Sequence, residues 1–184
     1  MIAYMIVCML YIPVLSNPNV RNSLIELIEI SPTLQPIGKI IDIVRKEGLY
    51  DELPLLWPIK GKYRVSSNYG YRYHPLTGLR KFHSGVDVAV ELATPVYAAG
   101  SGTVIFAGRK GGYGRCIIIQ HQYGFTSFYG HLSAYYTTAG KEIRQGQAIG
   151  FVGNTGESTG NHLHFEIRKN NKAINPIWYD GYEK

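Results

Sequence analysis

The chain has 184 residues, which is long enough for one domain with a hydrophobic core. Hydrophobic residues make up 45% and charged residues only 17%, which excludes a disordered protein or a highly charged tail. Its 21 Gly, 9 Pro and 15 Tyr favour a turn-rich β protein over a helical bundle. The net charge of +6 is uneven: residues 1–53 hold four basic and six acidic residues, whereas residues 54–184 hold 15 basic and seven acidic ones. A block at +8 indicates a polyanionic partner or environment.

The first segment, residues 1–21, begins with an apolar run from Met1 to Leu15 that only Pro13 interrupts. About 20 apolar residues are needed to span a bilayer, so the run is short for a transmembrane helix. It has the length of a signal-peptide hydrophobic region but lacks the basic residues that should precede one. We expect an export signal or a membrane anchor here, with membrane contact through residues 1–15. A buried helix or strand of the fold is the alternative.

The second segment, residues 22–53, has a helical pattern, because apolar residues recur at spacings of three and four between Leu24 and Val44. Pro32 and Pro36 divide it into two helices at most, and Gly48 suits a C-terminal stop. We expect a helical linker region without chemistry of its own.

The third segment, residues 54–184, alternates short apolar runs with Gly, Asn and Pro, which predicts many short strands in an all-β sandwich or barrel-like sheet. The expected strands lie at 63–67, 86–90, 95–98, 102–107, 116–121, 126–129, 148–152 and 162–167. The two cysteines, Cys8 and Cys116, lack the spacing of a zinc–thiolate site. Cys116 lies in an apolar run and is expected to be a buried small hydrophobe.

The histidines all fall in this third segment, and two spacings are those of a metal site. His83 and Asp87 are four residues apart, and His162 and His164 are two apart; on a strand, an even separation places both side chains on one face. Such a set suits Zn²⁺, and a catalytic zinc takes three protein ligands. One imidazole is therefore left over as a general acid–base or oxyanion-stabilising group. Spacing alone does not decide which one.

The remaining histidines have a simpler interpretation as solvated or hydrogen-bonded residues, which we expect of His74 and His121. His131 has no ligand spacing and stays open. The glycine-rich stretches 108–114 and 150–160 lack the GxxxxGK[ST] pattern of a phosphate loop, and GxSxG is absent. No recognised nucleic-acid-binding motif accompanies the basic residues, so no nucleic-acid partner is expected.

Seven ordered segments between Trp57 and Tyr179 resemble the M23 family of zinc metallopeptidases, the lysostaphin-like peptidoglycan endopeptidases. They are Ser67–Arg72 with His74-Pro75, His83–Asp87, Thr94–Ala98, Gly112–Gly114, Tyr129–Ser133, Gly146–Gly150 and Ser158–Glu166. The resemblance implies a compact, mainly β, antiparallel domain with an open groove, preceded here by the short helical N-terminal region. It also implies Zn²⁺ held by His83, Asp87 and His164, with His131 and His162 beside it as catalytic histidines.

The same resemblance implies the reaction, in which zinc-bound water attacks a peptide carbonyl of bacterial peptidoglycan. We expect His162 to be the general base and His131 to stabilise the developing charge. Residue 84 is Ser, where enzymes that cut glycine bridges commonly carry Tyr, so stem-peptide crosslinks are favoured as the target. The implied location is extracytoplasmic, in the cell envelope or secreted, where anionic cell-wall polymers would attract the positive block.

Two other functions remain open at this point. One is a catalytically inactive M23-like module that binds cell wall or activates amidases, and the other is a structural envelope or virion component that binds carbohydrate. All five site positions are filled in this sequence, which favours the enzyme, because intact metal ligands have little role in a binding scaffold.

Overall fold

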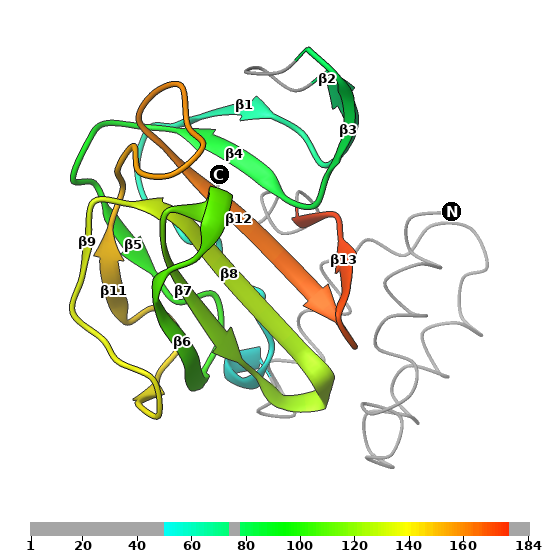
Figure 1. Ribbon diagram of the computed structural model, residues 1–184. Coiled ribbons are helices and arrows are strands. Elements are labelled where there is room, and N and C mark those ends of the chain that lie inside the picture. The colour runs from blue at the N-terminus through cyan, green and yellow to red at the C-terminus, as the bar shows by residue number, and fades with distance from the viewer. Residues whose placement is uncertain (1–49, 74–77, 177–184) are drawn as a thin grey trace. The chain divides into compact units, whose positions relative to one another are not determined.

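The computed structural model describes residues 50–73 and 78–176, and nearly all of them belong to one compact unit, Glu52–Lys184 (Figure 1). The predicted segment 1–21 and almost all of the predicted helical linker 22–53 lie outside the described residues, so the boundaries at 21 and 53 stay predictions. Three short 3-10 helices occur in the described part: η2 (Tyr50–Glu52), η3 (Gly111–Tyr113) and η4 (Gln122–Gly124). Among the described helices, none is long and apolar enough to cross a membrane.

An eight-stranded antiparallel sheet forms the body of the domain, in the order β1-β4-β12-β8-β7-β6-β10, with β13 paired to β12. Figure 1 shows β12, β8 and β7 running side by side. The strands are β1 (Arg64–Ser67), β4 (Val86–Ala89), β6 (Gly102–Arg109), β7 (Arg115–Gln120), β8 (Phe125–Leu132), β10 (Glu142–Ile143), β12 (His162–Lys169) and β13 (Lys172–Ile174).

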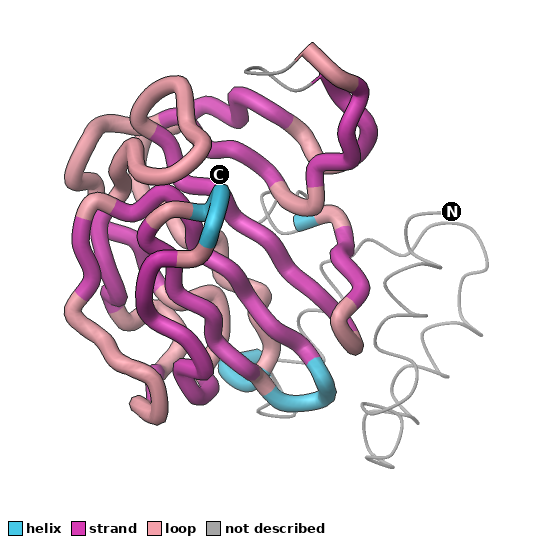
Figure 2. Tube along the Cα trace, in the orientation of Figure 1, coloured by secondary structure: helices cyan, strands magenta, loops and turns pink. Residues whose placement is uncertain are grey.

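Two small antiparallel sheets complete the described part. One pairs β5 (Pro95–Tyr97), β11 (Ala148–Phe151) and β9 (Ala134–Tyr135). The other is the hairpin of β2 (Gly70–Tyr73) and β3 (Arg80–His83), which Figure 1 shows beyond β1 and β4. Strands and loops dominate the described residues (Figure 2), so the predicted mainly β, antiparallel class is confirmed for them.

The core forms where apolar residues of neighbouring strands meet. On β12, alternate residues Leu163, Phe165 and Ile167 are fully buried, and Phe165 packs against Tyr129 of β8 with ring centroids 5.5 Å apart. The run 116–119 of β7 is buried throughout, including the free thiol of Cys116, as the sequence predicts. Because successive side chains of a strand point to opposite faces, the other residues of β12 (His162, His164 and Glu166) share the opposite face.

His121 lies in a separate buried cluster. Its Nδ1 donates to the carbonyl of Ser101 at 2.8 Å, and its Nε2 lies 2.7 Å from the hydroxyl of Ser127, whose oxygen is 2.9 Å from the hydroxyl of Tyr129. Burial lowers the pKa of His121 to about 4, so the ring is neutral at neutral pH. His121 is thus a hydrogen-bonded structural residue, as expected, whereas His74 lies outside the described residues.

Candidate active site

Four strands of two sheets bring the predicted site residues together. His164 on β12 pairs directly with Asp87 on β4, and on its other side with Gly130 on β8, the residue before His131. His83 ends β3 of the hairpin. The expectation that His83 and Asp87 share one strand is wrong, because the chain bends at Ser84-Gly85 between β3 and β4.

The bend depends on a glycine. A Cβ atom at Gly85 would lie 2.3 Å from the carbonyl oxygen of Phe165, so only glycine allows the chain to approach β12 so closely. This approach lets the ring of His83 reach back over Asp87. The four-residue spacing between them therefore reflects a tight bend rather than strand alternation.

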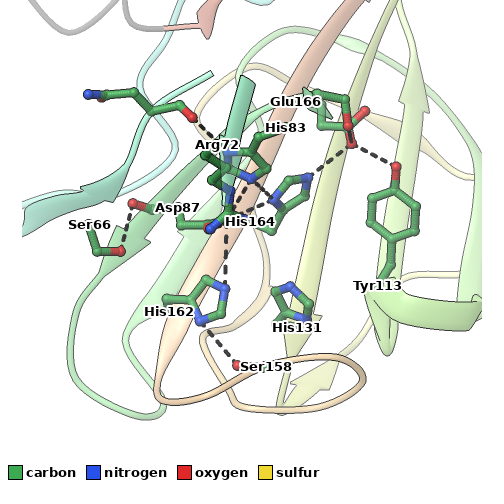
Figure 3. A network of polar contacts seen from close by, with 12 residues as sticks. Ser66, Arg72, His83, Asp87, Tyr113, His131, Ser158, His162, His164 and Glu166 are labelled. Atoms are coloured by element: carbon green, nitrogen blue, oxygen red, sulfur yellow. Dashed lines mark hydrogen bonds and ion pairs between the residues drawn. The ribbon is translucent and has the colours of Figure 1, made fainter. Parts of the chain in front are cut away.

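The side chains of His83, Asp87 and His164 converge through three atoms, as Figure 3 shows. His83 Nε2 and Asp87 Oδ1 are 3.1 Å apart, His164 Nδ1 and Asp87 Oδ1 are 2.8 Å apart, and the two ring nitrogens are 3.1 Å apart. All three residues are buried. Ligand atoms of a tetrahedral zinc, at bond lengths of about 2.0–2.1 Å, lie about 3.3 Å from one another, so this triangle is close to the required size.

The outer contacts of these residues fix which atoms face the centre (Figure 3). His83 Nδ1 donates to the carbonyl of Asn68 at 2.8 Å, which leaves its Nε2 with a lone pair. His164 Nε2 lies 2.9 Å from Glu166 Oε1 and donates to it, and Arg72 donates to the other oxygen of Asp87 at 3.1 Å. Two nitrogens and one carboxylate oxygen remain, a donor set that suits a divalent metal such as zinc.

The electrostatics keep the carboxylates of the site ionised. Burial raises the pKa of Asp87, but its close contacts with His164 and His83 outweigh this effect and hold that pKa well below its usual range. Burial likewise opposes ionisation of Glu166, yet its contacts with His164, Ser84 and Tyr113 lower its pKa to about 2. The pKa of His164 is raised instead: burial disfavours the charged ring, but the contacts with Asp87 and Glu166 outweigh burial.

The other two predicted residues, His131 and His162, lie side by side next to this cluster, with ring centroids 4.5 Å apart (Figure 3). His131 Nδ1 donates to the carbonyl of Thr155 at 2.7 Å, and His162 Nδ1 donates to that of Gly160 at 2.8 Å. Each ring therefore keeps the lone pair of its Nε2 in the neutral form. The Nε2 of His162 is 3.7 Å from Asp87 Oδ1, at the edge of the ligand cluster.

His131 reaches this position through an unusual backbone conformation. Regular alternation on β8 would direct it to the same face as Tyr129, which is buried in the core. Its φ of 61° lies in the left-handed region, which interrupts the alternation and lets the ring lie beside His162. Backbone strain of this kind is typical of functional sites. Burial lowers the pKa of His131 to about 4.

A groove of about 610 Å³ runs over these residues, and all five predicted side chains line it. Its walls differ in charge. Three basic residues, Arg64, Arg72 and Lys81, line it on the side of β1 and the β2–β3 hairpin. Tyr113 and the loop 157–161, which has no basic residue, also line it. The structure thus brings His83, Asp87, His131, His162 and His164 together and leaves His121 apart.

Sequence reasoning missed several contacts that hold the site. Glu166 had a signal, because the alternation of His162 and His164 continues to it on the same face of β12. Arg72 had none, since it lies 15 residues before Asp87 and meets it only through the folding of the hairpin. The backbone carbonyl groups that fix the imidazole tautomers also gave no signal in the sequence, because every residue has a carbonyl group.

Comparison with known proteins places these residues in a family. Residues 81–176 match the model of peptidase family M23. The chain is 42% identical over 135 residues to the DD-carboxypeptidase/endopeptidase Mpg of Neisseria meningitidis, covering 73% of this chain and 30% of that protein. It is 38% identical over 122 residues to the peptidoglycan DD-endopeptidase ShyA of Vibrio cholerae, covering 66% of this chain and 28% of that protein.

A solved structure agrees with these sequence matches. The crystal structure of a zinc-containing peptidase from Vibrio cholerae superposes with a TM-score of 0.62 at 32% sequence identity, over 66% of this chain and 38% of that one. The chain spans less than a third of the length of the two relatives, Mpg and ShyA. Residues 81–176, which match the family model, contain the histidine and aspartate cluster.

Proposed function

Because the chain belongs to peptidase family M23, we propose that it is a zinc-dependent endopeptidase that hydrolyses peptide bonds in bacterial peptidoglycan. The observation that carries the proposal is the convergence of three ligand atoms, from His83, Asp87 and His164, beside two histidines whose Nδ1 atoms donate to backbone carbonyls. The relatives' names, DD-carboxypeptidase/endopeptidase and peptidoglycan DD-endopeptidase, support the substrate.

The proposed zinc ligands are His83 Nε2, Asp87 Oδ1 and His164 Nδ1. Three protein ligands would leave one coordination position for water or substrate, as in catalytic rather than structural zinc sites. When bound, zinc supplies a Lewis acid that polarises a carbonyl and lowers the pKa of a water molecule. Arg72 holds the second oxygen of Asp87, so this carboxylate presents a single oxygen to the site.

We assign proton transfer to His162 and charge stabilisation to His131. The Nδ1–H of His162 is bound to a carbonyl, so its Nε2 accepts the proton of the attacking water and later returns it to the leaving amine. His131 has the same tautomer and becomes a donor only when its Nε2 gains a proton. Its lowered pKa keeps that proton away until negative charge develops on the neighbouring substrate oxygen, which then favours protonation.

Stem-peptide crosslinks are the proposed target, in preference to glycine bridges. Ser84 supports this choice, and so do the relatives named as DD-endopeptidases. The basic wall of the groove, with Arg64 and Lys81, suits a substrate that carries carboxylates, as stem peptides do. We further propose an envelope location, with the basic residues of the domain concentrating it near anionic cell-wall polymers.

Digestion of purified peptidoglycan by the full chain tests the proposal. We expect crosslinked muropeptide dimers to be converted into monomers, with a mass gain of one water per bond cut, and zinc to be present at one ion per chain. The His164→Ala variant is the inactive control. An intact dimer pool with bound muropeptides would instead support the inactive M23-like module, and products cut within glycine bridges would overturn the assignment of the bond.

A further inference from the structure

Glu166 lies behind the proposed ligand His164 and is a fully buried carboxylate whose two oxygens contact different groups. Oε1 accepts hydrogen bonds from His164 Nε2 at 2.9 Å, from the hydroxyl of Tyr113 at 2.7 Å and from that of Ser84. Oε2 accepts from Arg168, whose Nε is 2.8 Å away and whose Nη2 is 2.7 Å away. The carboxylate is thus fully hydrogen-bonded, which a buried charge requires.

The contact with His164 decides what this ring can do. A neutral imidazole carries one N–H, and the acceptor that takes it determines which nitrogen keeps the lone pair. Glu166 takes the Nε2–H, so Nδ1 is left to face His83 and Asp87. The two imidazoles are held differently, since a neutral carbonyl, that of Asn68, fixes His83, whereas an anion fixes His164.

We propose that Glu166 is the positioning residue of His164: it fixes the ring in the tautomer that presents Nδ1 and raises the affinity of the site for zinc. This inference rests on the proposed function. The negative charge of Glu166 makes the ring a stronger donor, and Arg168, stacked over Phe128 with its guanidinium carbon 4.2 Å from the ring centroid, keeps the carboxylate oriented. Glu166 is not among the three proposed ligands and acts on the metal position through His164.

Glu166→Gln is a sharp test because of Arg168. The guanidinium has only donors, so the amide oxygen of the glutamine will turn toward it. The amide NH₂ then faces His164 Nε2 and drives the proton of the ring onto Nδ1, the atom that should bind metal. Partners of this kind typically contribute 10–100-fold in metal affinity. We expect the zinc Kd of the full chain, measured by competition with a chromophoric chelator, to rise by about that factor.

Tyr113→Phe is the matched control, since it removes another hydrogen bond to the same oxygen of Glu166 and leaves His164 Nε2 bonded. Its zinc Kd should stay within about threefold of the wild-type value, because the tautomer is unchanged. The melting temperatures of the zinc-free proteins should fall for both variants. A merely structural Glu166 would therefore lower stability in both and alter affinity in neither.

Glu166→Asp provides a second route should the glutamine variant fail to fold, because it keeps the charge but draws the carboxylate back from Nε2; the same rise in Kd is expected. A folded Glu166→Gln or Glu166→Asp protein with wild-type zinc affinity would overturn the inference and leave the proposed function standing. A wild-type chain that binds no zinc would overturn both.

Discussion

Two buried histidines of this domain, His121 and His164, have opposite acid–base behaviour. Their exposed fractions are nearly equal, 5% and 6%, and each has hydrogen-bond partners at both ring nitrogens. Yet the pKa of His121 is lowered and that of His164 is raised. The partners explain the difference, because His121 faces a carbonyl and a hydroxyl, whereas His164 faces two carboxylates.

The comparison teaches that burial by itself does not mark a functional histidine. A ring between neutral partners stays neutral and holds strands together, as His121 does through Ser127 and Tyr129. A ring between anions attracts a positive charge, either a proton or a metal ion. The three predictions below change the partners or the titration of these rings, beginning with the largest effect.

Replacing the anion beside His164 by a neutral group should have the largest effect. In Asp87→Asn the shape is kept, but the charge is lost, and the amide oxygen turns toward the donor Arg72, so that the NH₂ stands where the ligand oxygen was. We expect zinc to be lost on dialysis and the rate of crosslink cleavage to fall by at least about 10³-fold. Metal analysis and muropeptide digestion measure the two losses. Stoichiometric zinc in the folded variant would contradict the proposed role of Asp87.

His162 represents a third situation, a ring with one nitrogen bound to a carbonyl and the other near the groove. Because it is not among the proposed ligands, His162→Ala should keep zinc. Loss of the proton acceptor should lower turnover by about 10²–10⁴-fold. The measurement is kcat on a defined crosslinked muropeptide alongside metal content. Wild-type turnover would show that the general base is another residue, and loss of zinc would make His162 a ligand.

The smallest expected effect is the pH dependence that His121 gives to stability. Unfolded, this ring binds a proton below its ordinary pKa of 6.5, whereas folded it does so only below about 4. Between these values the unfolded state binds more protons, so His121 makes stability fall as the pH falls through this window. The shift corresponds to about 3 kcal/mol at most.

The neutral variant His121→Gln is the control for that effect. Urea unfolding at pH 7 and pH 4 should show that wild type loses about 3 kcal/mol more than the variant does between the two pH values. Zinc affinity at pH 7 should be equal in the two proteins, because His121 lies in the separate cluster with Ser127 and Tyr129. An identical pH dependence would mean that His121 is not held neutral in the fold.

The sequence predicted most of the longer strands and the residues of the site, but not the contacts that orient those residues. All eight expected strand regions contain observed strands, because alternating and continuous apolar runs reflect burial directly. The short strands β2, β3, β9, β10 and β13 were not expected, since few of their residues are buried and pairing partners stabilise them. The resemblance, rather than any pattern, singled out His131.

By itself the sequence determined which side chains β12 presents together, because the two-residue period of a strand is a local property: His162, His164 and Glu166 had to share a face. Only the tertiary structure decided which nitrogen of each ring faces inward. Tautomers depend on acceptors that are distant along the chain, such as the carbonyl of Asn68 for His83 and that of Thr155 for His131. Every residue carries a carbonyl group, so the residue type does not indicate this role. Only the folded structure determines which carbonyl accepts the N–H of each ring.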